Sequence, residues 1–131
     1  MPESHPNVRI LAVDDEVALL ELLSVFLNRL GYEVETFSSA REALARFSSD
    51  PGAFSVVMAD LNMPDMPGEE LLEALFQRDP SVRVLVCSGS CMGSFVKVPG
   101  IEQRVRFLQK PFMPKMLDDA IRGLLDDPGE R

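Results

Sequence analysis

The chain has 131 residues, 46% of them hydrophobic, and its 21 acidic and 13 basic residues give a formal net charge of -8. This length suffices for one domain with a buried core, and no apolar stretch approaches the roughly 18 residues that a membrane-spanning helix needs. The acidic balance argues against direct nucleic-acid or membrane partners, because phosphate binding needs concentrated Lys and Arg. We therefore expect a single domain over residues 1–131, with a core at about 8–126. The N-terminus carries no export signal, so we expect a cytoplasmic protein.

Segments typical of strands and of helices alternate along the chain. The helical segments show apolar residues at helical spacing, as in Leu19, Leu23 and Leu27 before Gly31, which is placed to end a helix. Ser39 and Glu42 form a capping-box pattern that opens a second helix. Further helices are predicted from Gly68 and from Pro114. Strands are predicted at 8–13, 33–37, 56–59, 82–87 and 105–109.

Residues 91–103 interrupt this regularity. Gly93, Val96, Val98 and the Pro99-Gly100 pair are each unfavourable inside a helix. We expect a short or irregular fourth helix there, or a mobile loop. The whole pattern predicts an α/β fold in which helices cover both faces of a five-stranded parallel sheet, the doubly wound arrangement.

Polar residues stand where the predicted strands end. They are Asp14 and Asp15, Asp60, Ser88 and Lys110. Because the carboxyl ends of parallel strands share one edge of the sheet, we expect these side chains to converge there. Three carboxylates repel one another, and a single ammonium offsets only one charge, so the cluster calls for a cation. Oxygen ligands suit Mg²⁺, which often completes its shell with a phosphoryl oxygen.

The same residues, in this order, resemble the receiver (CheY-like) domain of two-component response regulators. The family's acidic pair is matched by Asp14 and Asp15, its phosphoacceptor by Asp60 in the run DLNMPDMPG, its hydroxyl residue by Ser88, and its lysine by Lys110 in KPF. The resemblance implies a flavodoxin-like (βα)5 fold with strand order 2-1-3-4-5. It also implies that the Lys110-Pro111 peptide bond is cis.

The resemblance implies a phosphorelay function as well. Asp60 would accept a phosphoryl group from a histidine kinase or a histidine phosphotransfer protein. Mg²⁺ would be held by Asp14, Asp15 and Asp60 together with the backbone carbonyl of Asn62. The chain would then be a signalling receiver, with no enzyme activity beyond limited self-phosphorylation and autodephosphorylation.

Signalling also needs a switch between two surfaces. In the family, the hydroxyl residue moves toward the new phosphoryl group, and an aromatic residue of the fifth strand turns inward behind it. Ser88 and Phe107 occupy these positions here, while Ser88 and Lys110 would hold phosphoryl oxygens. The altered surface would bind an unknown downstream protein, and the chain would be a monomer or a weak, phosphorylation-dependent dimer.

Two other functions remain open at this stage. One is a Mg²⁺-dependent phosphohydrolase that forms an aspartyl phosphate, although such enzymes commonly carry a second Asp where this chain has Asn62. The other is a receiver-like binding module that takes no phosphate. Turnover of phosphate esters would indicate the first, and the lack of a Mg²⁺-dependent response to beryllofluoride would indicate the second.

Overall fold

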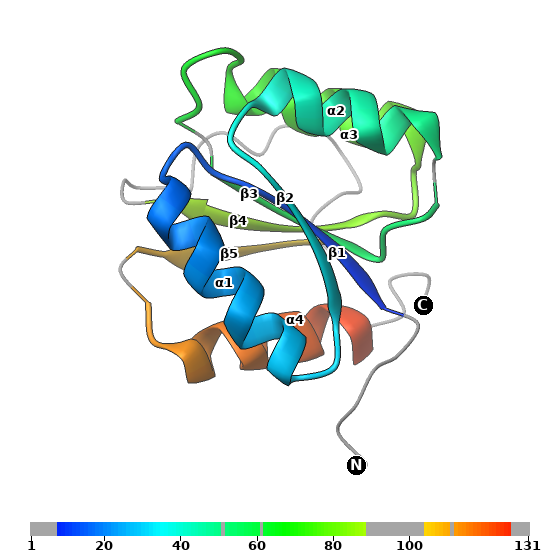
Figure 1. Ribbon diagram of the computed structural model, residues 1–131. Helices are drawn as coiled ribbons and strands as arrows, with labels where there is room; N and C mark the ends of the chain where they lie inside the picture. Colours follow the sequence, from blue (N-terminus) through cyan, green and yellow to red (C-terminus); the bar gives the residue numbers. More distant parts are fainter. Residues whose placement is uncertain (1–7, 51, 61, 89–103, 111, 127–131) are drawn as a thin grey trace.

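A five-stranded parallel sheet forms the centre of the molecule (Figure 1). The computed structural model describes residues 8–50, 52–60, 62–88, 104–110 and 112–126. The strands are β1 (Arg9–Val13), β2 (Glu33–Phe37), β3 (Val56–Asp60), β4 (Arg83–Ser88) and β5 (Val105–Gln109). Their order in the sheet is β2-β1-β3-β4-β5, and every neighbouring pair is parallel. The predicted doubly wound, flavodoxin-like strand order is confirmed.

Helices cover both faces of this sheet. Figure 1 shows α2 and α3 on one side and α1 and α4 on the other. The helices are α1 (Val17–Arg29), α2 (Ala40–Ser49), α3 (Gly68–Arg78) and α4 (Pro114–Asp126). The segment predicted to form a short or irregular helix, 91–103, and the Lys110-Pro111 peptide bond both lie outside the described residues.

The middle strand, β3, is buried along its whole length. Val57 and Ala59 pack against α2 and α3, whereas Val56 and Met58 pack against α1 and α4. A parallel strand with both faces covered needs an unbroken apolar run, and this explains why the sequence shows no polar alternation there. The first polar residue after that run is Asp60, at the carboxyl end of the strand.

Local hydrogen bonds define the end of α1 and the start of α2. Gly31 has a positive φ of 98°, and its N–H donates to Asn28 O while the N–H of Tyr32 donates to Leu27 O. This is the Schellman arrangement that glycine favours after a helix. At the start of α2, Ser39 Oγ accepts from the backbone N–H of Glu42 at 3.2 Å, so the predicted cap is confirmed.

The observed elements differ from the sequence prediction in small ways. β1 begins one residue later than predicted, at Arg9, and β4 is shifted by one residue to Arg83–Ser88. Leu44 in α2 is only partly buried. Leu20, which the predicted apolar spacing of α1 left out, is 4% exposed. Among the described residues, no helix is both long enough and apolar enough to cross a bilayer.

Candidate functional site

The carboxyl ends of β1, β3 and β5 bring three charged residues together. Asp14 directly follows β1, Asp60 is the last residue of β3, and Lys110 directly follows β5. Asp14 is 4% exposed and Asp60 is 7% exposed, and they are the only buried charged residues in the described part of the chain. The predicted convergence is therefore present for these three residues.

Lys110 lies at the centre of the cluster. Its Nζ donates to Asp14 Oδ2 at 2.6 Å, to Glu16 Oε1 at 3.1 Å and to Asp60 Oδ2 at 3.2 Å. Sequence reasoning missed Glu16, whose side chain is 62% exposed. The only signal for it was its place immediately after the acidic pair, at the N-cap of α1. One ammonium thus contacts three carboxylates.

Backbone N–H groups orient the two buried carboxylates. The N–H of Glu16 donates to Asp14 Oδ1 at 2.9 Å, and the N–H of Asn62 donates to Asp60 Oδ1 at 3.0 Å. Each carboxylate therefore has one oxygen on a backbone donor and the other on Lys110. Because both oxygens are held, the carboxylate planes are fixed before any ligand arrives.

Burial and charge shift the proton affinities within the cluster. Burial raises the pKa of Asp14, while hydrogen bonds from Lys110 and from the backbone of Glu16 oppose that shift. Burial lowers the pKa of Lys110, but the hydrogen bonds to Asp14 and Glu16 and the nearby carboxylate charges outweigh it, so the net shift is upward. Lys110 is therefore a permanent cation at neutral pH.

The acidic residues also form a group that could hold a metal ion. Asp14, Asp15 and Asp60 each offer a carboxylate oxygen, and these atoms all lie within 4.8 Å of one another. Asp14 and Asp60 are buried, whereas Asp15 is exposed. An all-oxygen donor set of this kind fits a hard divalent ion such as Mg²⁺, which keeps several waters in protein sites.

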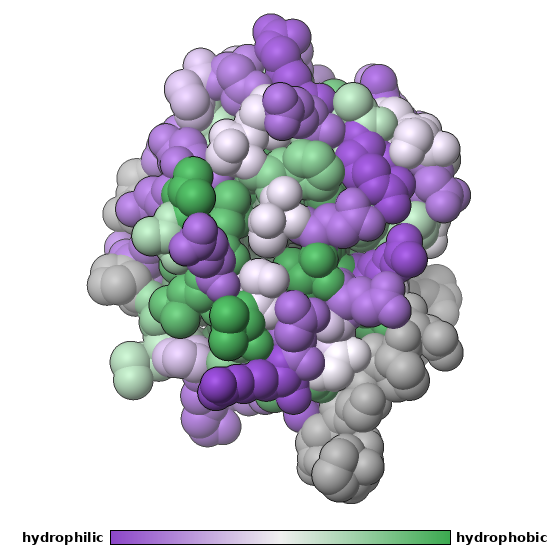
Figure 2. All heavy atoms as spheres, viewed as in Figure 1, coloured by the Kyte–Doolittle hydropathy of each residue, from purple (hydrophilic) through white to green (hydrophobic). Residues whose placement is uncertain are grey.

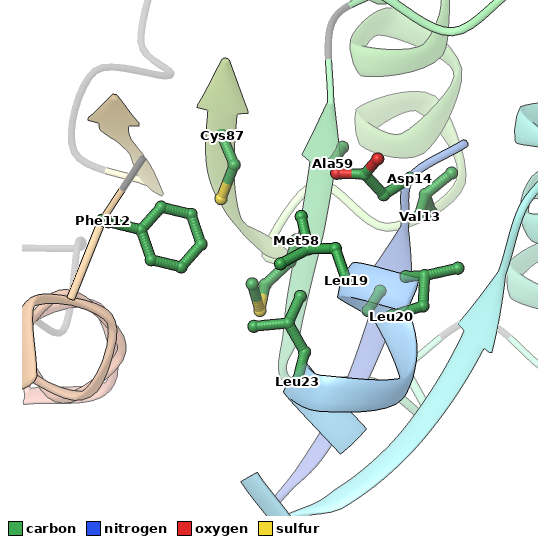
Figure 3. Close-up of a pocket in the computed structure, with 10 residues that line it drawn as sticks. Val13, Asp14, Leu19, Leu20, Leu23, Met58, Ala59, Cys87 and Phe112 are labelled. Atoms are coloured by element: carbon green, nitrogen blue, oxygen red, sulfur yellow. The ribbon is translucent and has the colours of Figure 1, made fainter. Parts of the chain in front are cut away.

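A small, mostly apolar pocket adjoins Asp14. Figure 3 shows a pocket bordered by Leu19, Met58, Cys87 and Phe112, with Asp14 at its upper edge. The cavity measures only about 10 Å³, so the side chains nearly fill it. The same burial raises the pKa of the Cys87 thiol to about 12. A more open space adjoins the charged cluster and is lined by Glu16, Leu19, Lys110 and Phe112.

The other predicted site residues take the expected backbone positions. Ser88 ends β4, paired in register with Gln109, and Phe107 pairs with Val86. Phe107 is 38% exposed, so its ring is not within the core. Asn62 is exposed and contributes the N–H that binds Asp60.

Comparisons with known proteins agree with this fold and site. The family model of the response regulator receiver domain matches residues 10–122. The two-component response regulator ARR11 of Arabidopsis thaliana is 42% identical over 70 residues, 53% of this chain and 13% of that protein. Sensor kinase CckA of Brucella abortus (strain 2308) is 30% identical over 120 residues, 92% of this chain and again 13% of the relative. The chain thus spans about an eighth of the length of these relatives.

A solved structure resembles the whole fold. The crystal structure of a CheY-like receiver domain protein from Methanospirillum hungatei JF-1 aligns with a TM-score of 0.81 and 31% sequence identity, covering 92% of this chain and 95% of that one. The sheet order and the family match both indicate a receiver domain. The chain belongs to the response regulator receiver domain family of two-component systems.

Proposed function

We propose that the chain is a phosphoacceptor in which Asp60 receives a phosphoryl group from a phosphohistidine. A carboxylate oxygen of Asp60 attacks phosphorus, a P–O bond forms, and the P–N bond to the donor imidazole breaks. The imidazole nitrogen leaves with the bonding pair and takes up a proton. The product is an aspartyl phosphate. The observation that carries this proposal is the contact of the Lys110 ammonium with both Asp14 and Asp60 at the edge of the sheet.

The charges of the site favour transfer to Asp60. Phosphoryl transfer spreads negative charge over the three equatorial oxygens, so a fixed cation beside the acceptor lowers the barrier. Lys110 is 17% exposed and is held by side chains from the β1–α1 loop and from the end of β3, so it is preorganised next to Asp60. Ser88 would hold another phosphoryl oxygen. This role is an expectation from its place at the end of β4.

Mg²⁺ is the cofactor that the donor set suits. Asp14, Asp15 and Asp60, together with the backbone carbonyl of Asn62, would hold the ion. When bound, Mg²⁺ would neutralise carboxylate charge and polarise a phosphoryl oxygen. Lys110 alone faces three carboxylates, so the cluster retains negative charge to attract a divalent ion.

The partner would be a histidine kinase or a histidine phosphotransfer protein, and an apolar surface beside the site suits its docking. Figure 2 shows hydrophobic side chains gathered over α1. A cavity of about 220 Å³ between α1 and α4 is lined by residues that include Leu19, Leu22, Val25 and Phe112. Leu19 and Phe112 also border the space next to Lys110. We expect a donor that brings its phosphohistidine to Asp60 to contact this adjoining surface.

Phosphorylation would then change the surface that downstream proteins meet. Ser88 would move toward the phosphoryl group, and Phe107 would turn inward behind it. The 38% exposure of Phe107 matches the outward position expected before phosphorylation. A phosphoryl group can shift this equilibrium only by contacts that differ between the two states, and Ser88 supplies such a contact.

Intact-mass measurement after incubation with acetyl phosphate and Mg²⁺ tests the proposal. The wild type should gain one phosphoryl group, Asp60→Ala should gain none, and Asp79→Ala, at the far end of α3, should behave as the wild type does. A gain that persists in Asp60→Ala would overturn the assignment. Repeated turnover of unrelated phosphate esters would indicate a phosphohydrolase instead, and a wild type that takes neither phosphate nor beryllofluoride would indicate a binding module.

A further inference from the structure

Asp65 lies in the loop between β3 and α3, and it binds a different loop with both of its carboxylate oxygens. Oδ1 accepts from the backbone N–H of Ala40 at 3.2 Å. Oδ2 accepts from the N–H of Arg41 at 3.0 Å and from Ser39 Oγ at 2.8 Å. Asp65 thus caps the start of α2, although 24 to 26 residues separate it from its hydrogen-bond donors in sequence.

These hydrogen bonds are charge-assisted, because their acceptor is a carboxylate, and such bonds are stronger than those between neutral groups. The first N–H groups of a helix have no partner within the helix, and the helix dipole favours a negative charge there. The hydrogen bonds from Arg41 and Ser39 hold the pKa of Asp65 down, to about 2. Ser39 contributes the helix's own cap by accepting from Glu42. Asp65 is therefore ionised at neutral pH, where its carboxylate accepts these hydrogen bonds.

Apolar packing also fixes the same loop. Met63 and Met66 flank Asp65, and both are buried in the core cluster that joins the sheet to α2 and α3. Three side chains of this loop are therefore held, Met63 and Met66 by apolar packing and Asp65 by hydrogen bonds. Asn62 immediately precedes this anchored stretch.

The anchored stretch connects to the phosphoacceptor. The N–H of Asn62, three residues before Asp65, donates to Asp60 Oδ1 at 3.0 Å. On the other side, the residues leading into α2 follow Phe37, whose carbonyl accepts from the N–H of Asp14 at 3.1 Å. Asp65 therefore joins the start of α2 to the loop that follows Asp60, and the strand before α2, β2, is hydrogen-bonded to Asp14 at the end of β1.

We propose that Asp65 is a positioning residue for the site: by tying the β3–α3 loop to the start of α2, it holds Asn62 and the Asp60 carboxylate where a divalent ion and a phosphodonor need them. This inference rests on the proposed phosphoacceptor function of Asp60. Outer groups that orient metal ligands commonly matter for affinity even though they never touch the ion.

Asp65→Asn in the full chain tests the inference. The amide keeps the shape of the side chain but replaces one acceptor oxygen with a donor that faces backbone N–H groups. Without metal, amide hydrogen exchange at Asn62 should become faster. The dissociation constant for Mg²⁺ alone should rise roughly tenfold. Phosphorylation by acetyl phosphate at limiting Mg²⁺ should slow accordingly and recover at high Mg²⁺.

Asp79→Asn is the matched control. Asp79 Oδ1 accepts from the N–H and Oγ of Ser81 in the turn after α3, so this change also replaces a carboxylate that accepts local hydrogen bonds. It should leave Mg²⁺ affinity and Asn62 exchange unchanged. If Asp65→Asn also leaves both unchanged while lowering stability, Asp65 is only a helix cap and the inference is overturned.

Two further outcomes are separable. If Asp65→Asn does not fold, Ser39→Ala removes one of the three contacts and keeps the charge, and it should raise the Mg²⁺ dissociation constant by a smaller factor. No change in that variant would overturn the inference. A wild type that binds neither Mg²⁺ nor phosphate contradicts the proposed function, and Asn62 exchange in the Asp65 variant then decides the positioning role by itself.

Discussion

The Nζ atom of Lys110 lies 2.6 Å from Asp14 Oδ2, although 96 residues separate the two in sequence. This distance is that of a short, charge-assisted hydrogen bond between largely buried groups. The contact joins the first and last strands of the sheet in sequence order. It also shows how the protein tolerates two buried carboxylates at one edge.

Lys110→Met should destabilise the metal-free protein by about 3 kcal/mol, because removing one partner of a buried ion pair leaves the other charges without compensation. Asp14 and Asp60 are those charges. Added Mg²⁺ should restore more stability to the variant than it adds to the wild type. Urea unfolding with and without Mg²⁺ measures both effects. Lys115→Met, at an exposed pair with Asp119, is the control and should cost little.

Glu16→Gln should lower stability by less than about 1 kcal/mol, because exposed ion pairs contribute little. Glu16 is 62% exposed, and Lys110 keeps its contacts to Asp14 and Asp60. The same urea titration checks this expectation. A loss as large as that of Lys110→Met would mean that Glu16, and not the buried carboxylates, holds the lysine in place.

The fold could be predicted from the sequence because each element carries its own signal. β3 is an unbroken apolar run, Gly31 supplies a positive φ, and Ser39 caps α2. The site was predictable for a related reason: Asp14, Asp60 and Lys110 stand at strand ends, and parallel topology alone brings strand ends together. Here local pattern and global topology agree.

Contacts that depend on the placement of loops could not be predicted. Glu16 reads as an ordinary exposed acid at a helix start, and only the folded chain places it 3.1 Å from a lysine 94 residues away. Asp65 stands between prolines and reads as a turn residue. Its binding to the start of α2 requires the packing of Met63 and Met66, which no sequence period specifies.

Phe107 should become less exposed when beryllofluoride and Mg²⁺ occupy the site, because the proposed switch would draw its ring inward from its present 38% exposure. A fluorinated phenylalanine at this position would show the change as reduced contact with a dissolved paramagnetic agent. The Asp60→Ala variant, with no acceptor carboxylate, should show no change. Unaltered accessibility in a wild type that binds beryllofluoride would contradict the switch role of Phe107.

Asp65 should make stability depend on pH in acid. Its pKa in the folded protein is about 2, below the ordinary 3.8. A depressed carboxyl pKa stabilises the folded state above the unfolded pKa, and this contribution is lost as pH falls from about 4 toward 2. The stability difference between wild type and Asp65→Asn should therefore be constant near neutrality and shrink over that range. Urea midpoints in a pH series measure it. A difference that stays constant down to pH 2 would contradict the predicted role of the charge.

Gly123→Ala should stabilise the protein despite a close approach. Glycine inside a helix costs up to about 1 kcal/mol relative to alanine. A Cβ at Gly123 would lie 2.9 Å from Cζ of Arg106, but this atom belongs to the far end of a flexible, exposed side chain. We expect the guanidinium to move aside, leaving a net gain of about 0.5 kcal/mol.

A double-mutant cycle with Arg106→Ala separates the two effects on Gly123→Ala. The Arg106→Ala change removes the three atoms nearest to the new methyl group, so the gain in this background should approach the full helix-propensity difference of about 1 kcal/mol. Equal gains in both backgrounds would mean that Arg106 moves at no cost. A loss of stability in the wild-type background, with a gain in the other, would show that the guanidinium is held firmly over α4 and that β5 and α4 are coupled through it.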